Sequence, residues 1–407
     1  MPSDTLVRPS AAVKIDGTAL TSQVLDRVVR LRAELSFGQA SRLQMTVVLY
    51  DGWESVFKIG ATYEIGLDPG TGTPQPVLKG EITALAVEAD KSEKSLIITG
   101  HDKSHRLGNN VKVVTHVEKS YGDIIGQIAS AAGLTPKVHA ALSTPRFPHI
   151  VQAASDLAFV ADIARRTGME FGVEGNELRV HPRTAGATVT LEMGEVLRSF
   201  EARYTTSERP TGVQVTGWDA ASKQTIVATD EGELRTSMGS VPVVPANPQP
   251  RFGARQVNTW QGALTSIEEA KSVAKGIARR MTSHELSGEG ETIGLPTIVP
   301  GCMVGITGID AQWNGSYYVT SVEHLYAREA YVTRFTVGGL NDDGLVDLVA
   351  GPASHSVLSA LPAGVTIGIV TNTKDTNNQH KSGHVKVKFP YLNDSESWWA
   401  RVATIGA

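Results

Sequence analysis

The stretches that decide the fold are GATYEIGLD at residues 60–68, GEITAL at 80–85 and LIITG at 96–100, and, far along the chain, GCMVGITGID at 301–310, GSYYVTSV at 315–322 and FTVG at 335–338. Both series follow one plan: a glycine opens a strand that runs to an acidic turn, a second glycine opens a longer strand, and a third strand ends in glycine. Such self-similarity indicates one structural unit used twice. The alternative is that any two β-meanders look alike, because the identity between the two series is low.

The residues around the first series predict a sheet of short strands. Runs that are apolar, or that alternate between apolar and polar residues, are separated by turn signals such as Asp16-Gly17 and Pro69-Gly70. The expected strands are 11–15, 28–37, 43–50, 62–67, 78–87 and 95–100. Because the chain has 40 glycines and its runs are rich in Val, Ile and Thr, it is expected to be mainly β.

The period of the apolar residues changes after residue 110, which predicts a small α/β module at 111–188. Ser120 is a candidate N-cap with Asp123 three residues later. The apolar face of the helix that follows consists of Tyr121, Ile124, Ile125 and Ile128. A second helix is expected to begin near Ser155 and to end at Gly168, where a glycine can adopt the left-handed conformation.

Strands resume from about residue 189, and a second sheet is expected over 189–350. One helix is predicted within it, at 266–282, capped by Thr265 with a glutamate three residues later. The proline-rich stretch 241–253 is typical of an exposed connector. The glycines between 288 and 294 indicate a loop and not a nucleotide-binding cradle.

The overall composition argues against several classes of protein. The formal charge of the 407 residues is -4, whereas a dedicated nucleic-acid binder normally carries a basic surplus on one face. Cys302 is the only cysteine, so no intrachain disulfide can form, which suits assembly in a reducing cytoplasm. Cys302 lies in an apolar run, where a core role is favoured over a nucleophile. The start of the chain lacks signal-peptide features, and no segment approaches the roughly 20 apolar residues of a membrane span.

Two groups that contain histidine are candidates for a chemical site. His101 and His105 flank Asp102 at a spacing that some zinc sites use, but the ligand set is incomplete. A polar strand-to-helix corner in which Asp102 caps backbone amides is the favoured reading. Glu323 and His324 are adjacent on an expected strand and therefore point to opposite faces, which does not suit an acid–base couple. No nucleophile elbow or phosphate-binding loop is present, so no catalytic, cofactor or metal residue is assigned.

The sequence resembles the hub region of VgrG proteins and of phage late-control D proteins. The segments that carry this resemblance are GHDKSHRL from Gly100, QAASDLAFVADIARRTGMEFGVEGNELRV from Gln152 and the stretch from Gly294 to Gly339. The C-terminal segment HVKVKFPYLNDSESWWARVATIGA from His384 is similar to the start of the OB-fold that follows the hub in spike proteins. A basic strand, an acidic turn and a Trp-Trp-Ala-Arg strand in that order make it the most specific of these motifs.

The resemblance implies a homotrimer in which two related β-barrels per chain form a ring that meets a hexameric inner tube. The expected domains are a first hub β-barrel at 1–110, an α/β insertion module at 111–188, a second hub β-barrel at 189–350, and a linker with the N-terminal part of an OB-fold at 351–407. Only three strands are expected in that last part, whereas an OB-fold needs five, so the natural protein is expected to continue into a spike. The further partners implied are baseplate wedge proteins, a PAAR-type tip and effector cargo, with a target membrane met only during puncture.

Candidate interaction residues are Phe389, Trp398 and Trp399. The two tryptophans are adjacent on an expected strand, so one faces the barrel core and the other faces outward. Packing of the outer ring against a neighbouring chain is favoured over base stacking, because the adjacent loop and the whole chain are acidic.

The favoured hypothesis is therefore a non-catalytic hub and spike subunit of a contractile injection system. It would be assembled in the cytoplasm without a signal peptide, as part of a phage-tail-like particle. Two alternatives remain from the sequence: a tail-associated cell-wall hydrolase and an OB-fold nucleic-acid-binding protein.

Overall fold

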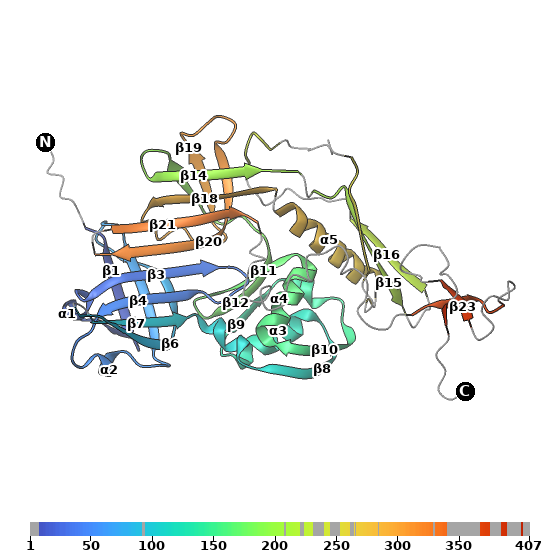
Figure 1. Cartoon of the computed structure of the whole chain (residues 1–407), viewed down its shortest axis with the longest axis horizontal. Helices are drawn as coiled ribbons and strands as arrows, with labels where there is room; N and C mark the ends of the chain where they lie inside the picture. The colour runs from blue at the N-terminus through green and yellow to red at the C-terminus, as the bar shows by residue number, and fades with distance from the viewer. Residues whose placement is uncertain are drawn as a thin grey trace.

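The structure is a computed structural model, and it is mainly β with a small helical component, as the sequence predicts. It describes residues 8–339, except 92–93, 207–208, 220–223, 231–239, 245–252, 261–263, 265, 284 and 329, together with 367–374, 384–388 and 400–401. Within these residues, no helix is long and apolar enough to cross a membrane. The largest assembly of strands is a single 13-stranded sheet that runs through most of the chain (Figure 1).

The N-terminal half of this sheet contains every strand expected around the first series. Its strands are β1 (Ser10–Ile15), β2 (Thr18–Ala19), β3 (Val28–Ser36), β4 (Arg42–Val48), β5 (Thr62–Asp68), β6 (Gln75–Ala89) and β7 (Lys94–His101). Two single-turn helices, α1 (Ser22–Leu25) and α2 (Trp53–Val56), lie in the connections. The inward side chains alternate along the strands and form one buried cluster that includes Leu31, Met45, Ile65, Ile82 and Ile98.

The second half contributes β13 (Thr188–Glu192), β14 (Leu197–Tyr204), β18 (Leu286–Ile293), β19 (Met303–Thr307), β20 (Gly315–Ala327) and β21 (Ala330–Gly338). The strand order is β13-β19-β20-β21-β18-β14, and the order in the first half is β1-β5-β6-β7-β4-β3. When the strands of each half are numbered along the chain, the same numbers appear in the same places in both orders. β13 therefore corresponds to β1, β14 to β3, β18 to β4, β19 to β5, β20 to β6 and β21 to β7. The two halves therefore repeat one strand order, as the paired series predict.

The repetition extends to individual backbone irregularities. The β6–β7 ladder skips Thr83, the β20–β21 ladder skips Thr320, and each threonine hydroxyl donates to the carbonyl of Thr99 or Thr336 respectively, at 3.3 Å in both cases. β-Bulges are usually conserved among proteins that share a fold. Their recurrence at matching places supports one duplicated unit over two unrelated meanders.

The turn that opens each series is also the same. The amide of Gly60 donates to Ile82 and that of Gly301 to Val319, both at 2.8 Å, and both glycines adopt positive φ. However, Tyr63 pairs with Gly80 whereas Val304 pairs with Tyr317. Gly80 thus corresponds to Tyr317, so the alignment of Gly80 with Gly315 is wrong by two residues. The outer strands differ too: β1 runs antiparallel to β5, and β13 runs parallel to β19.

The two halves are joined edge to edge. β3 pairs antiparallel with β20 over seven residues, from Ser36↔Ser321 to Arg30↔Ala327. In Figure 1 these strands lie side by side between the blue and orange halves of the sheet. Backbone hydrogen bonds, and not a flexible linker, therefore hold the repeats together.

The α/β module follows β7. It contains η1 (Lys103–Gly108), β8 (Val111–Lys119), α3 (Tyr121–Ala131), β9 (Thr135–Val138), η2 (Ala140–Ser143), β10 (Phe147–Ser155), α4 (Asp156–Thr167), β11 (Met169–Glu174) and β12 (Glu177–Pro182). The predicted caps are confirmed: Ser120 and Asp123 form a capping box, the Ser155 hydroxyl accepts from Ala158, and Gly168 ends α4 in the left-handed conformation. Sequence analysis did not identify the β8–β10 pair.

A second insertion separates β14 from β18. It comprises β15 (Gly212–Asp219), β16 (Gln224–Asp230), β17 (Gln256–Trp260) and α5 (Ile267–Ser283), with a core of its own. The helix expected at 266–282 is confirmed, but its cap is Ser266, whose hydroxyl accepts from Glu269. Thr265, the expected cap, lies outside the described residues. α5 packs against α4 where Gly168 and Gly276 meet, since a Cβ on Gly168 would lie 2.8 Å from Cα of Gly276.

One expectation for the second half is wrong. The stretch with Gly288 and Gly290 is not a loop but strand β18, and its glycines are required by close neighbours. A Cβ on Gly288 would lie 2.3 Å from the carbonyl oxygen of Glu201, and one on Gly290 would lie 2.3 Å from the ring of Phe335. The expected exposed connector, 241–253, is described only in part: Val241 is buried in the core of the second half, Pro242 is exposed, and residues 245–252 lie outside the described residues.

The C-terminal part has three described strands, β22 (Ile369–Asn372), β23 (His384–Lys388) and β24 (Ala400–Arg401), which pair in sequence order as an antiparallel meander. They overlap the three strands expected in this part of the chain, 365–371, 384–390 and 398–405.

Candidate functional site

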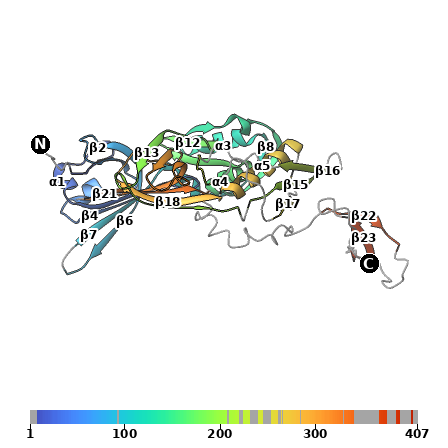
Figure 2. The same cartoon turned by 90° about the horizontal axis from the view of Figure 1, so that it is seen from above.

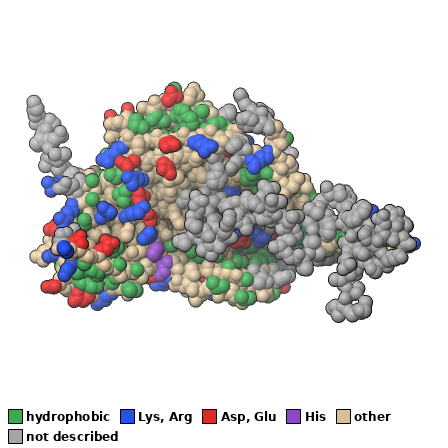
Figure 3. Space-filling view, viewed as in Figure 1, with side chains coloured by type: hydrophobic (Ala, Val, Ile, Leu, Met, Phe, Trp, Pro, Cys, Tyr) green, Lys and Arg blue, Asp and Glu red, His purple; other side chains and the backbone are tan. Residues whose placement is uncertain are grey.

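The outward face of the joined sheet carries a groove whose lining is rich in charged residues. The groove has a volume of about 780 Å³ and lies across β3, β20, β21, β18 and β14. Its charged lining consists of Arg32, Arg334, Glu34, Glu201, Glu289, Glu291 and Glu323. With five glutamates against two arginines, the groove is acidic. Figure 3 shows acidic and basic side chains interspersed over this part of the sheet.

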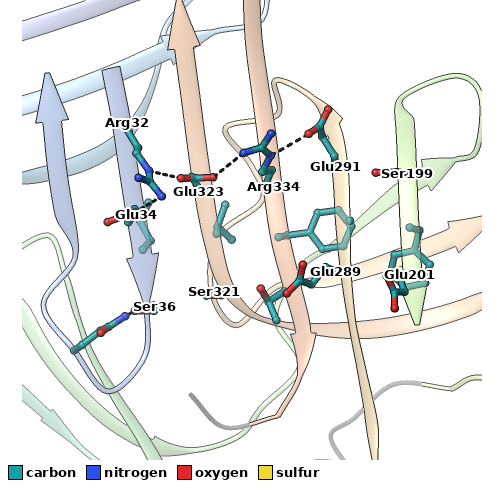
Figure 4. Close-up of a pocket in the computed structure, with 17 residues that line it drawn as sticks. Arg32, Glu34, Ser36, Ser199, Glu201, Glu289, Glu291, Ser321, Glu323 and Arg334 are labelled. Atoms are coloured by element: carbon teal, nitrogen blue, oxygen red, sulfur yellow. Dashed lines mark hydrogen bonds and ion pairs between the residues drawn. The ribbon is translucent and has the colours of Figure 1, made fainter. Parts of the chain in front are cut away.

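An ion-pair ladder crosses the strands of this groove (Figure 4). Arg32 of β3 pairs with Glu323 of β20, and Arg334 of β21 lies 3.5 Å from the other oxygen of Glu323 and 3.0 Å from Glu291 of β18. The hydrogen bond from Arg334 to Glu291 raises the pKa of that arginine. The ladder spans the junction between the two halves, so side-chain charges reinforce the β3–β20 backbone pairing.

The charged groups that line this groove are carboxylates and guanidinium groups. Among the described residues, no group of three or more His, Cys, Asp or Glu could hold a metal ion. Glu323 faces the groove while His324 is fully buried, which confirms that they point to opposite faces. Burial lowers the pKa of His324 to about 4. Cys302 is a buried core residue, as predicted, and burial raises the pKa of its thiol, which disfavours the reactive thiolate.

The His101–Asp102–His105 cluster is the polar corner that the sequence predicts. The buried Asp102 carboxylate accepts from the amides of Ser41 and Ser104, both at 2.8 Å, and begins η1. His105 pairs with Glu81 at 3.0 Å. The carboxylate of Asp102 thus accepts hydrogen bonds from backbone amides. The corner ties the end of β7 to Ser41, which precedes β4, and His105 ties it to Glu81 of β6.

The predicted interaction residues lie elsewhere in the chain. Phe389, Trp398 and Trp399 are all outside the described residues, so they stay predictions. The groove was missed by sequence analysis, although its signal is visible: charged residues alternate in RLRAE at 30–34 and GEGE at 288–291. What the sequence does not indicate is that these two strands belong to one sheet.

The fold is shared with solved tail proteins. The prophage MuSo2 43 kDa tail protein of Shewanella oneidensis matches with a TM-score of 0.60 and 14% identity, over 81% of this chain and 98% of that chain. The tail protein of Neisseria meningitidis MC58 matches with a TM-score of 0.56 and 13% identity, over 84% and 98%. At these identities the likeness is one of fold.

A third match is the E. coli c3393 protein, described as a component of the type VI secretion system with structural similarity to T4 bacteriophage tail proteins gp27 and gp5. Its TM-score is 0.54 at 11% identity, over 96% of this chain and 93% of that chain. No curated protein sequence matches the chain. The model of the family described as the Alg8 N-terminal domain matches residues 11–328, and the chain therefore belongs to that family.

Proposed function

We propose that this chain is a non-catalytic structural subunit of a contractile injection system, a homotrimeric hub that joins a hexameric inner tube to the puncturing tip. The observation that carries the proposal is the duplicated strand order in one continuous sheet. Three copies with two equivalent units each offer six similar contacts, which lets a three-fold object meet a six-fold one. The fold shared with tail proteins supports the same role.

In this role the chain transmits force. Contraction of an outer sheath would drive the tube forward, and the hub would carry the tip ahead of it. The β3–β20 pairing and the Arg32–Glu323–Arg334 ladder suit this task, because a load on one half passes directly into the other. We assign the two barrels to 1–110 and 189–350 and the α/β module to 111–188.

We assign residues 351–407 to the linker and OB-fold start that lead toward the spike. The order of β22, β23 and β24 supports this assignment. Phe389, Trp398 and Trp399 would contact neighbouring chains there. Baseplate wedge proteins, a PAAR-type tip and cargo are the further partners proposed, and the particle would assemble in the cytoplasm.

Deletion of the gene in a strain that produces the particle tests this role. We expect electron microscopy to show loss of intact particles with a sheath, a tube and a tip, because tube assembly lacks its starting platform. The wild-type gene supplied in trans should restore them. Complete, tipped particles in the deletion strain would contradict the proposal.

A further inference from the structure

We propose that copies of this chain associate head to tail by strand pairing, with β14 of one copy adding to the open edge of the distal half of β6 in the next. The inference rests on the proposed hub role and names the subunit interface that the hub would use. The partner that covers the open edge of β14, and the open edge of β6, is thus a second copy of this chain.

The template for this contact lies within the chain. The two repeats are joined where β3 of the first pairs with β20 of the second. In the duplicated strand order, β14 holds the place of β3, and β6 holds the place of β20. A joint between the second repeat of one copy and the first repeat of the next would therefore use β14 and β6 in the same way.

The residue correspondence between β3 and β14 follows from their ladders. Leu31 pairs with Met45 in β4 and Phe200 pairs with Gly290 in β18. In each ladder one irregularity separates the first pair, Val28↔Val47 or Leu197↔Thr292, from the pairs that follow. Ala33 therefore corresponds to Ala202. The matched bulges at Thr83 and Thr320 set the second correspondence, in which Val87 holds the place of His324.

These correspondences fix a register for the interface. His324 pairs with Ala33 and Tyr326 pairs with Leu31 inside the chain. The equivalent pairs between copies are Val87↔Ala202 and Ala89↔Phe200. All four side chains are apolar, so the contact would bury an apolar row.

Both edges are open within the part of the chain that the structure describes. β14 is the last strand of the sheet, and beyond Glu81 only β7 pairs with β6. Figure 2 shows the β6–β7 hairpin projecting from the body. Val87 is 55% exposed, whereas its counterpart His324, which pairs with Ala33 of β3, is 0% exposed. An open strand edge is a template for pairing with another chain, and natural proteins rarely leave one long and apolar.

Head-to-tail contacts of this kind produce a closed ring when the rotation between neighbours closes, and a filament when it does not. Within one chain, the β3–β20 pairing already relates the two equivalent repeats by one rotation of this kind. Repeating a similar step between copies arranges the units around one axis, with the acidic groove on a common face of the ring.

Engineered disulfides test the register. In a Cys302→Ser background, we expect oxidation of the double variant Val87→Cys/Ala202→Cys to give a covalent species of three chains on a non-reducing gel. The control Val87→Cys/Arg198→Cys displaces one cysteine by four residues, roughly 13 Å along a strand, beyond the about 7 Å that a disulfide can span. It should remain at the mass of one chain. Cross-linking of the control alone, or of neither variant while the protein is a trimer, would overturn the interface and leave the hub role standing.

A charge substitution gives a second test that does not depend on oxidation. Val87→Arg places a charge on an exposed side chain of the single chain, so folding should be unaffected, but it would bury that charge between copies. We expect sedimentation to show a fall from three chains to one. Val113→Arg, at an 81% exposed position of β8, is the control and should remain a trimer. A Val87→Arg protein that stays trimeric would overturn the interface, whereas a wild-type chain that is already monomeric would overturn the hub role as well.

Discussion

Arg183→Ala is expected to lower the free energy of unfolding by about 3–5 kcal/mol, the cost of breaking a buried ion pair from one side. Arg183 donates to Glu170 at 2.9 Å and to the carbonyl of Gly339 at 2.6 Å, and its guanidinium lies 4.7 Å from the ring centroid of Tyr318. Tyr318 donates to the other Glu170 oxygen at 2.6 Å. The cluster joins β11 of the α/β module to β20, so its loss should loosen that contact.

The cost arises because the side chains of Arg183 and Glu170 are only 9% and 2% exposed, and Glu170 would keep a buried charge without its cation. Arg179→Ala is the matched control, because Arg179 pairs with Glu177 at the surface and is 44% exposed. Its effect should stay below about 1 kcal/mol. Urea unfolding of both variants at one chain concentration measures the difference, and equal effects would refute the buried-pair account.

The second large effect expected is an acid-induced loss of up to about 3 kcal/mol of stability that depends on His324. Burial lowers its pKa from 6.5 to about 4 in the folded chain. The unfolded chain therefore binds the proton first as the pH falls. This contribution to stability is fully present above pH 6.5 and is lost as the pH falls toward 4.

His324→Val should remove this pH-dependent contribution, because it removes the imidazole that titrates. Valine is the residue at the equivalent position 87 of the first repeat. The measurement is the slope of unfolding free energy against pH between 6.5 and 4, and not the stability at one pH. Tyr331→Phe is the control: it removes the hydroxyl 2.9 Å from the imidazole but keeps the histidine, so the slope should remain. An unchanged slope in His324→Val would refute the assignment.

Local signals in the sequence were sufficient for several elements. The capping box at Ser120 and the left-handed glycine at 168 depend on residues within one helical turn, and both are as predicted. The strands around Tyr63 and Val304 were also identified, because alternation and turn residues are read within a short window. The predicted repeat of strand order rests on these same short-range patterns.

Features that depend on distant neighbours were not predicted. Gly290 is in a strand because the ring of Phe335 occupies the space of its side chain, which no local pattern indicates. Gly80 is required by the carbonyl of His101 and the hydroxyl of Tyr63, so it does not mark a strand start, and the alignment based on it was displaced. The groove needs the pairing of β3 with β20, two strands almost three hundred residues apart.

The solution mass of the purified chain tests the central claim most directly. Duplication of the sheet unit, with two open edges, predicts an assembly of three chains of 43.4 kDa each at micromolar concentration. Native mass spectrometry should therefore give three times the chain mass, without an added partner. A stable species of 43.4 kDa across that concentration range would contradict the account.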